Sequence, residues 1–136
     1  DLSFNVNVIT GSDGVIRGAS GGHCDTAAAA RLAIIVAPLV RGRIPTLVEQ
    51  VTTCVTPGSS IDILVTDHGI AVNPARPELA QRLREAGLEV VSIDWLRARA
   101  LQLTGEPQPI AFTDKVVAVV RYRDGSVIDV VHQVAE

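Results

Sequence analysis

Residues 18–25 are Gly18-Ala19-Ser20-Gly21-Gly22-His23-Cys24-Asp25, and the segments on either side of them indicate the fold class. Before it, Phe4 to Thr10 alternates apolar and polar side chains, which predicts a half-buried strand. After it, the alanine-rich run from about Asp25 to Leu32 predicts a helix, with Asp25 or Thr26 as its capping residue. The stretch therefore predicts a glycine turn that joins a strand to the start of a helix.

The glycines of this turn permit two interpretations. Glycine has no Cβ, so Gly21 and Gly22 allow a positive φ and let a ligand approach the backbone closely. The free N–H groups and the dipole at a helix start attract an anion, or an oxygen that gains negative charge. A plain turn with no ligand explains the same residues, and the stretch alone leaves both alternatives open.

Composition indicates the class of protein. The 136 residues suffice for one domain with a core, and 47% of them are apolar but only 3% aromatic. Valine-rich runs alternate with alanine-rich segments, which favours an α/β fold. The net charge of −3 gives no indication of nucleic acid or an anionic membrane as partner. No apolar run approaches the roughly 20 residues of a membrane span.

The ends of the chain and its cysteines give three further expectations. The chain begins at Asp1, contains no Met and shows no signal peptide, so we expect a piece of a longer chain. Cys24 and Cys54 do not form a disulfide framework. Free thiols indicate a cytoplasmic protein.

The rest of the pattern predicts a single domain over 1–136, in which a layered mixed β-sheet carries flanking helices. The expected strands are 15–19, 33–39 (covered on both faces), one or two within 47–56, 61–66, 89–93, 115–123 and 126–134. The expected helices are 78–86 and 95–103, the second capped by Asp94. Asp124-Gly125 lies between the last two strands and predicts a C-terminal β-hairpin.

Several side chains are of types that carry chemistry. His23, Cys24, Cys54 and His68 are ligands that zinc accepts, but their spacing forms no recognised pattern, so we expect no metal site. Cys24 is interpreted as a nucleophile or, more simply, as a small turn residue. Asp13 and Asp67 lie in turns, where a carboxylate serves as a catalyst or only as a turn or cap residue.

Two loops carry the remaining candidates. Arg41 and Arg43 flank a glycine, which suits phosphate or carboxylate binding, although two solvated charges explain them equally well. Ligands on α/β sheets usually bind beyond the carboxyl ends of parallel strands. The loops 21–25 and 67–69 both follow expected strands, so we expect them to face one crevice.

The order of these motifs resembles the C-terminal half of the acyl-CoA transferases. In that superfamily a Gly-Gly loop ending in Asp, a Val-Thr-Thr element and a Val-Thr-Glu-Tyr-Gly-Ile-Ala element follow one another. Here they correspond to residues 18–25, 51–53 and 65–71. The closer resemblance is to the citrate lyase α subunits, over residues 4–23, 38–46, 67–77 and 121–126. It covers essentially the whole chain and implies that about three quarters of the subunit lies outside it.

The resemblance implies the layered fold of CoA transferases and ribose-5-phosphate isomerases, and a C-terminal domain of a longer bacterial subunit. It implies a transferase that exchanges acetate for citrate on the thioester of an acyl carrier protein, supporting citrate fermentation to oxaloacetate and acetate. The thioester is carried by a phosphoribosyl dephospho-CoA prosthetic group. The implied partners are the N-terminal half of the subunit, the β subunit, the acyl carrier protein (γ), citrate and acetate, in a homo-oligomer.

The chemistry of the opening loop agrees with this activity. When a citrate carboxylate attacks a thioester carbonyl, the carbonyl oxygen becomes an oxyanion. The amides of Gly21 and Gly22 are suited to hold it, a contribution of about 3 kcal/mol per donor. A mixed anhydride follows, and the freed thiolate attacks its other carbonyl. Many CoA transferases use a glutamate nucleophile upstream, but Asp13 is the nearest acid here.

The resemblance thus implies two sets of site residues and no metal. The catalytic set is Gly21, Gly22, His23 and Asp13; the substrate- and CoA-binding set is Ser20, Arg41, Arg43, Asp67, His68 and Gly69. The citrate-binding arginine is left open among Arg17, Arg41, Arg43 and Arg76. Asp67-His68 replaces the Glu-Tyr of the superfamily element, which leaves the role of His68 open. The alternative function is a non-catalytic domain that binds the CoA-type arm or serves assembly when isolated.

Overall fold

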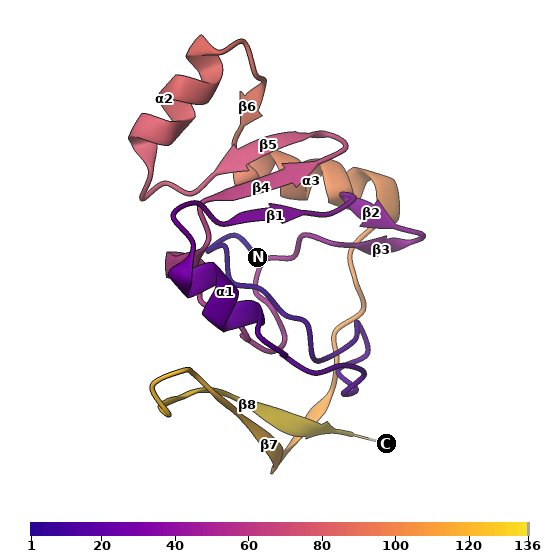
Figure 1. Cartoon of the computed structure of the whole chain (residues 1–136). Helices are drawn as coiled ribbons and strands as arrows, with labels where there is room; N and C mark the ends of the chain where they lie inside the picture. The colour runs from indigo at the N-terminus through magenta and orange to yellow at the C-terminus, as the bar shows by residue number, and fades with distance from the viewer. Residues whose placement is uncertain (136) are drawn as a thin grey trace.

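A computed structural model describes residues 1–135 and gives them a mixed α/β architecture (Figure 1). Its central sheet has four strands in the order β1-β4-β5-β6. These are β1 (Ile34–Val36), β4 (Ile63–Thr66), β5 (Gly69–Val72) and β6 (Val90–Val91). β1 runs parallel to β4, β4 antiparallel to β5, and β5 parallel to β6. The expectation of an α/β fold with a mixed sheet is therefore confirmed.

Two further pairs of strands lie outside the central sheet. β2 (Val40–Arg41) pairs antiparallel with β3 (Ile44–Pro45), and β7 (Phe112–Arg121) pairs antiparallel with β8 (Val127–Val134). Figure 1 shows β7 and β8 at the bottom of the view, with α1 between them and the central sheet. β7 and β8 do not join the central sheet, because the segment 105–111 carries β7 away from it.

The three helices described are α1 (His23–Ala29), α2 (Pro77–Glu85) and α3 (Ile93–Thr104). The capping residue of α3 is Ser92, whose Oγ accepts a hydrogen bond of 3.1 Å from the Trp95 amide. The prediction that Asp94 caps it is wrong, because the helix begins two residues earlier than expected. α1 also begins earlier, at His23, and its N-cap is Gly22 rather than Asp25 or Thr26.

The strands expected over 4–10, 15–19 and 47–56 do not form. Isolated bridges alone join Val6 to Thr56 and Thr10 to Ile16 in these parts of residues 1–135. Side chains, some of them close in sequence, bind amides that a neighbouring strand would otherwise bind. The Asn7 side-chain oxygen accepts from Ile9 and Thr10, and the Asp1 carboxylate accepts from Ser3, Asn5 and Val51.

The core lies between the central sheet, α3 and the N-terminal loops. Its buried side chains are Phe4, Ala33, Leu39, Leu47, Ile61, Ala71, Ile93, Leu96 and Ala100. β1 is an edge strand, and its Ile34 and Val36 are 45% and 76% exposed. The expectation that residues 33–39 are covered on both faces is therefore wrong for this chain. Among residues 1–135, no helix combines the length and apolarity that crossing a membrane requires.

Candidate functional site

A cavity of about 890 Å³ lies where the N-terminal loop, the start of α1, the β2–β3 hairpin and the segment before β7 meet. Most of its wall is apolar. The polar and charged side chains that contribute to it include Thr10, His23, Arg41, Thr46, Thr52 and Thr66. A mainly apolar cavity with a few polar groups is the usual form of a small-molecule site.

His23 is the residue of the glycine loop that lines this cavity. It is the first residue of α1, and its Nδ1 lies 2.7 Å from Oγ1 of Thr56. Thr56 is fully buried, and its backbone is bound on both sides to Val6. The hydrogen bond therefore fixes the imidazole of His23 to a rigid part of the chain.

A second buried threonine lies in the same region. Oγ1 of Thr53 accepts a 3.0 Å hydrogen bond from Oγ1 of Thr10, which in turn accepts one of 2.9 Å from Asn7. Thr53 is fully buried, whereas Thr10 lines the cavity. These side chains hold the N-terminal loop against the segment that contains Thr56.

Gly21 and Gly22 do not belong to the residues that line the cavity, and both are exposed. Within residues 1–135, their amides have no hydrogen-bond acceptor in the protein. Ser20 lies outside the cavity wall too, and its carbonyl accepts from the His23 amide at 3.1 Å. The oxyanion role of the two glycine amides stays a prediction, and His23 is what the loop contributes to the cavity.

Asp13 forms an exposed ion pair with Arg17 and also accepts a hydrogen bond from the Val15 amide. The hydrogen bond from Arg17 is the main reason why the pKa of Asp13 lies below its ordinary value. Gly11 and Ser12 line the cavity, but Asp13 does not. The structure thus places Asp13 in a turn, with its carboxylate outside the cavity wall.

The loop 67–69 also lies outside the cavity wall, although the preceding Thr66 belongs to it. Oδ1 of Asp67 accepts a 2.8 Å hydrogen bond from the Leu39 amide, which lowers the pKa of this carboxyl. The amide of His68 donates to Oγ1 of Thr66 at 3.1 Å. A Cβ on Gly69 would lie 3.0 Å from a methyl group of Val91, so this glycine permits close packing.

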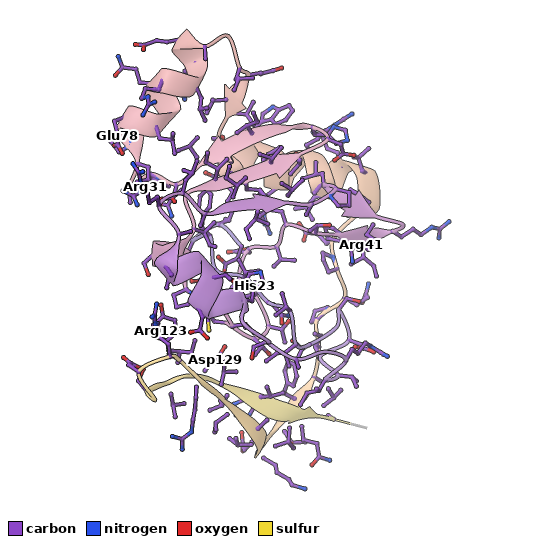
Figure 2. All side chains as sticks on the ribbon, viewed as in Figure 1. His23, Arg31, Arg41, Glu78, Arg123 and Asp129 are labelled. Atoms are coloured by element: carbon purple, nitrogen blue, oxygen red, sulfur yellow. The ribbon has the colours of Figure 1, made fainter. Side chains whose placement is uncertain are left out.

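The structure separates the candidate arginines. Arg41 on β2 lines the cavity, whereas Arg43 lies in the adjacent turn outside it. Arg17 pairs with Asp13, and Nε of Arg76 donates to the buried Asp62 at 2.6 Å. Figure 2 labels Arg41 and His23, which come from β2 and α1. Of the four, Arg41 is the arginine in the cavity wall formed by residues 1–135.

The cysteines and the metal-ligand types do not converge on a site. Cys24 is buried, and the half-buried Cys54 donates its amide hydrogen to Asp129 at 2.5 Å. Burial, followed by the nearby Asp129 charge, raises the pKa of the Cys54 thiol. Within residues 1–135, no three His, Cys, Asp or Glu side chains are grouped so that they could hold a metal ion.

Sequence reasoning missed Thr56 and Thr66. Thr66 directly precedes the loop 67–69, and its position at the end of a strand was the available signal. Thr56 gave no local signal, because its contact with His23 spans 33 residues of sequence. Buried threonines with a defined partner are visible only once the segment 51–57 is placed beside α1.

Comparisons with known proteins agree over nearly the whole chain. The family model for the citrate lyase alpha subunit (CitF) matches residues 1–134. The citrate lyase alpha chain of Escherichia coli is 82% identical over 136 residues, which are 100% of this chain and 27% of its own length. That of Klebsiella pneumoniae is 70% identical over 134 residues, which are 98% of this chain and 26% of its own.

A solved structure is also similar. It is a Streptococcus mutans protein designated the alpha subunit of citrate lyase, in complex with citrate, with 56% identity and a TM-score of 0.96. The match covers 99% of this chain and 26% of that one, so this chain spans about a quarter of the relatives it matches. Its C-terminal position within such a subunit stays a prediction. The resemblance found in the sequence is confirmed, and the chain belongs to the family of citrate lyase alpha subunits.

Proposed function

We propose that this chain forms part of a transferase subunit of citrate lyase, which exchanges acetate for citrate on an acyl-carrier-protein thioester. Membership of the family supports this proposal, as does the similar Streptococcus mutans structure in complex with citrate. The structural observation that supports the proposal most is that His23 and Arg41 line one cavity of about 890 Å³. A cation and an imidazole in one mainly apolar cavity suit a reaction in which a carboxylate of the substrate attacks a carbonyl carbon.

Arg41 has the chemistry to bind citrate. A guanidinium group makes two parallel hydrogen bonds to a carboxylate, which fixes the orientation of the carboxylate as well as its position. One citrate carboxylate held in this way brings an oxygen to the carbonyl carbon of the acetyl thioester. Thiolate leaves as the mixed anhydride forms, and its attack on the citryl carbonyl then releases acetate.

The remaining partners are part of the same proposal. The thioester arm, a phosphoribosyl dephospho-CoA group, enters as substrate on the acyl carrier protein. The cavity volume falls within the roughly 300–1,000 Å³ of typical ligand pockets, which suits citrate and the acyl end of the arm. We place the rest of the subunit, the β subunit and the acyl carrier protein beside this chain, in a cytoplasmic homo-oligomer.

The test compares Arg41→Ala with Arg43→Ala in the complete subunit, since the two arginines lie on one hairpin but only Arg41 lines the cavity. Exchange of labelled citrate onto acetyl-carrier protein is measured at several citrate concentrations. A hydrogen bond to a charged group contributes about 1.5–3 kcal/mol, so Arg41→Ala should raise KM for citrate at least about tenfold. Equal effects of the two substitutions would contradict the assignment of Arg41.

One observation favours the alternative function in assembly. Ile34 and Val36 on β1, and Val119 and Val127 on the final strands, are 45–76% exposed. Exposed apolar side chains on two sheets are typical of surfaces that pack against another domain. Titration of the isolated chain with dephospho-CoA tests the remaining alternative of an arm-binding domain, because an absence of saturable binding excludes it.

A further inference from the structure

We propose that Thr56 is a positioning residue, which donates its hydroxyl hydrogen to Nδ1 of His23 and so keeps the hydrogen of the neutral imidazole on Nε2. His23 then offers a hydrogen-bond donor, rather than a base, to an oxygen of the substrate. The assignment of the tautomer stands on the geometry alone. Its consequence for acyl exchange rests on the proposed function above.

The contact between Thr56 and His23 is rigid. Oγ1 of Thr56 lies 2.7 Å from Nδ1 of His23, which is a short distance for a hydrogen bond between a hydroxyl and a ring nitrogen. The Thr56 amide donates to the Val6 carbonyl at 3.1 Å, and the Val6 amide donates to the Thr56 carbonyl at 2.9 Å. Thr56 is fully buried and does not line the cavity, so it acts through His23 rather than on a ligand.

The partners of the Thr56 hydroxyl determine the direction of this hydrogen bond. Within residues 1–135, the Thr56 hydroxyl has Nδ1 of His23 as its single hydrogen-bond partner. If Nδ1–H donated to Oγ1, the hydroxyl hydrogen would be left in a buried site without an acceptor, which is unfavourable. If the hydroxyl donates to Nδ1, its hydrogen is bound and both atoms are satisfied. Nδ1 then carries the lone pair, and Nε2 carries the hydrogen.

The tautomer determines what the imidazole ring of His23 can do chemically. A neutral imidazole with its hydrogen on Nε2 has no lone pair at that nitrogen, so it cannot take a proton there. It can donate one hydrogen bond to an acceptor of the oxygen class, namely a carboxylate or a thioester carbonyl. Donation to an oxygen that gains negative charge stabilises the transition state of acyl transfer. This assigns to His23 the function that the sequence suggested for the amides of Gly21 and Gly22.

The tautomer is tested by ¹⁵N NMR of the complete subunit, labelled at histidine nitrogens and kept at pH 8. The His23 signals are identified by their loss in His23→Gln. We expect a pyridine-type signal for Nδ1 and a pyrrole-type signal for Nε2. A pyrrole-type signal for Nδ1 would overturn the proposal. This measurement is made on the parent protein, so no substitution can affect its folding.

Three variants at buried threonines test the role of the hydroxyl. Thr56→Val keeps the shape of the side chain but removes the donor, so the ring should become a mixture of both tautomers, and Thr56→Ser should restore the Nε2–H form. Thr53→Val is the matched control, since Thr53 is equally buried and hydrogen-bonds Thr10 rather than His23. An unchanged tautomer in Thr56→Val, or an equal change in Thr53→Val, would overturn the proposal.

Kinetics of citrate exchange test the functional consequence. Removing an oxyanion donor typically lowers kcat about 100- to 1,000-fold, so disordering the donor in Thr56→Val should lower kcat about tenfold or more. KM for citrate should change little, and Thr56→Ser should recover kcat. A normal kcat in Thr56→Val would overturn the positioning role. Absence of exchange in the parent protein would instead contradict the proposed function, and the NMR result would still decide the tautomer.

Discussion

Gly21 and Gly22 are neighbours in sequence but differ in backbone conformation. Gly21 has φ 52°, in the left-handed region, whereas Gly22 has φ −94° and is the N-cap of α1. A Cβ built on either residue meets no atom within 4 Å. Any difference in stability between substitutions at the two positions therefore reflects backbone conformation and not a steric collision.

We predict that Gly21→Ser lowers the free energy of unfolding by about 1–2 kcal/mol, because an L-residue in the left-handed region is strained. Gly22→Ser should change it by less than about 0.5 kcal/mol, since serine is a favoured N-cap residue. Urea unfolding of both variants measures the difference. Equal losses of stability would show that the conformation of Gly21 is not the cause.

Cys54 provides a second prediction at the residue scale. Burial and the charge of Asp129 raise its pKa above the ordinary 9.0, so the reactive thiolate should form only at higher pH. In a Cys24→Ser background, the rate of alkylation by iodoacetamide is measured against pH. Asp129→Asn removes the charge but keeps an acceptor for the Cys54 amide, so it should shift the profile to lower pH. An unshifted profile would mean that Asp129 does not affect the thiol.

At the scale of elements, Gly58 joins the N-terminal loop to the central sheet. It begins a short 3₁₀ turn, Gly58–Ser60, just before β4. Its amide donates to the Asn5 side chain, and its carbonyl accepts from the Asn73 side chain. A Cβ at this position would lie 1.8 Å from the carbonyl oxygen of Ser3. The turn therefore requires glycine at position 58, because the atom that a Cβ would meet belongs to the backbone and cannot rotate away.

We predict that Gly58→Ala lowers the free energy of unfolding by roughly 3 kcal/mol, at the upper end of overpacking costs, since the backbone must move to admit the methyl group. The melting temperature of the variant measures this loss. Gly87→Ala is a suitable comparison, because its Cβ meets nothing within 4 Å and the cost there is that of a positive φ alone. A smaller loss at Gly58 than at Gly87 would contradict the steric explanation.

In the whole molecule, the β7–β8 pair is largely exposed, and Val120 and Val131 are its buried hydrophobic residues. Val116, Val117 and Val119 on β7 are each about half exposed, and one edge of this strand is unpaired within residues 1–135. Among the few contacts with the rest are the Cys54–Asp129 hydrogen bond and the approach of Phe112 to Gly14. Figure 2 shows Asp129 between the final strands and α1.

We predict that amide hydrogens of β7 exchange more slowly in the complete subunit than in the isolated chain, because the remainder of the subunit covers this strand. Hydrogen exchange read by mass spectrometry compares the two proteins. β4 is the internal control, since it is paired on both sides and should exchange at similar rates in both. Equal protection of β7 in the two proteins would indicate that its valines face solvent in the assembled subunit as well.

The sequence predicted the elements whose signals are local. Pro77 at the start of α2, the apolar run of β4 and the segments on either side of Asp124-Gly125 are all found near the expected residues. It failed over 4–10 and 47–56, where the side chains of Asp1 and Asn7 bind the amides that an alternating pattern would give to a neighbouring strand. Alternation records which side chains are apolar, not where the backbone hydrogen bonds go.

Residue identity and short spacing were sufficient to predict the family and the α/β class of this chain. Three further facts were visible only in the folded chain: His23 and Arg41 share a cavity, Gly21 and Gly22 lie outside it, and Thr56 holds the imidazole. These facts depend on contacts between segments tens of residues apart. Their cause is the packing of loops around the core, which no local pattern encodes.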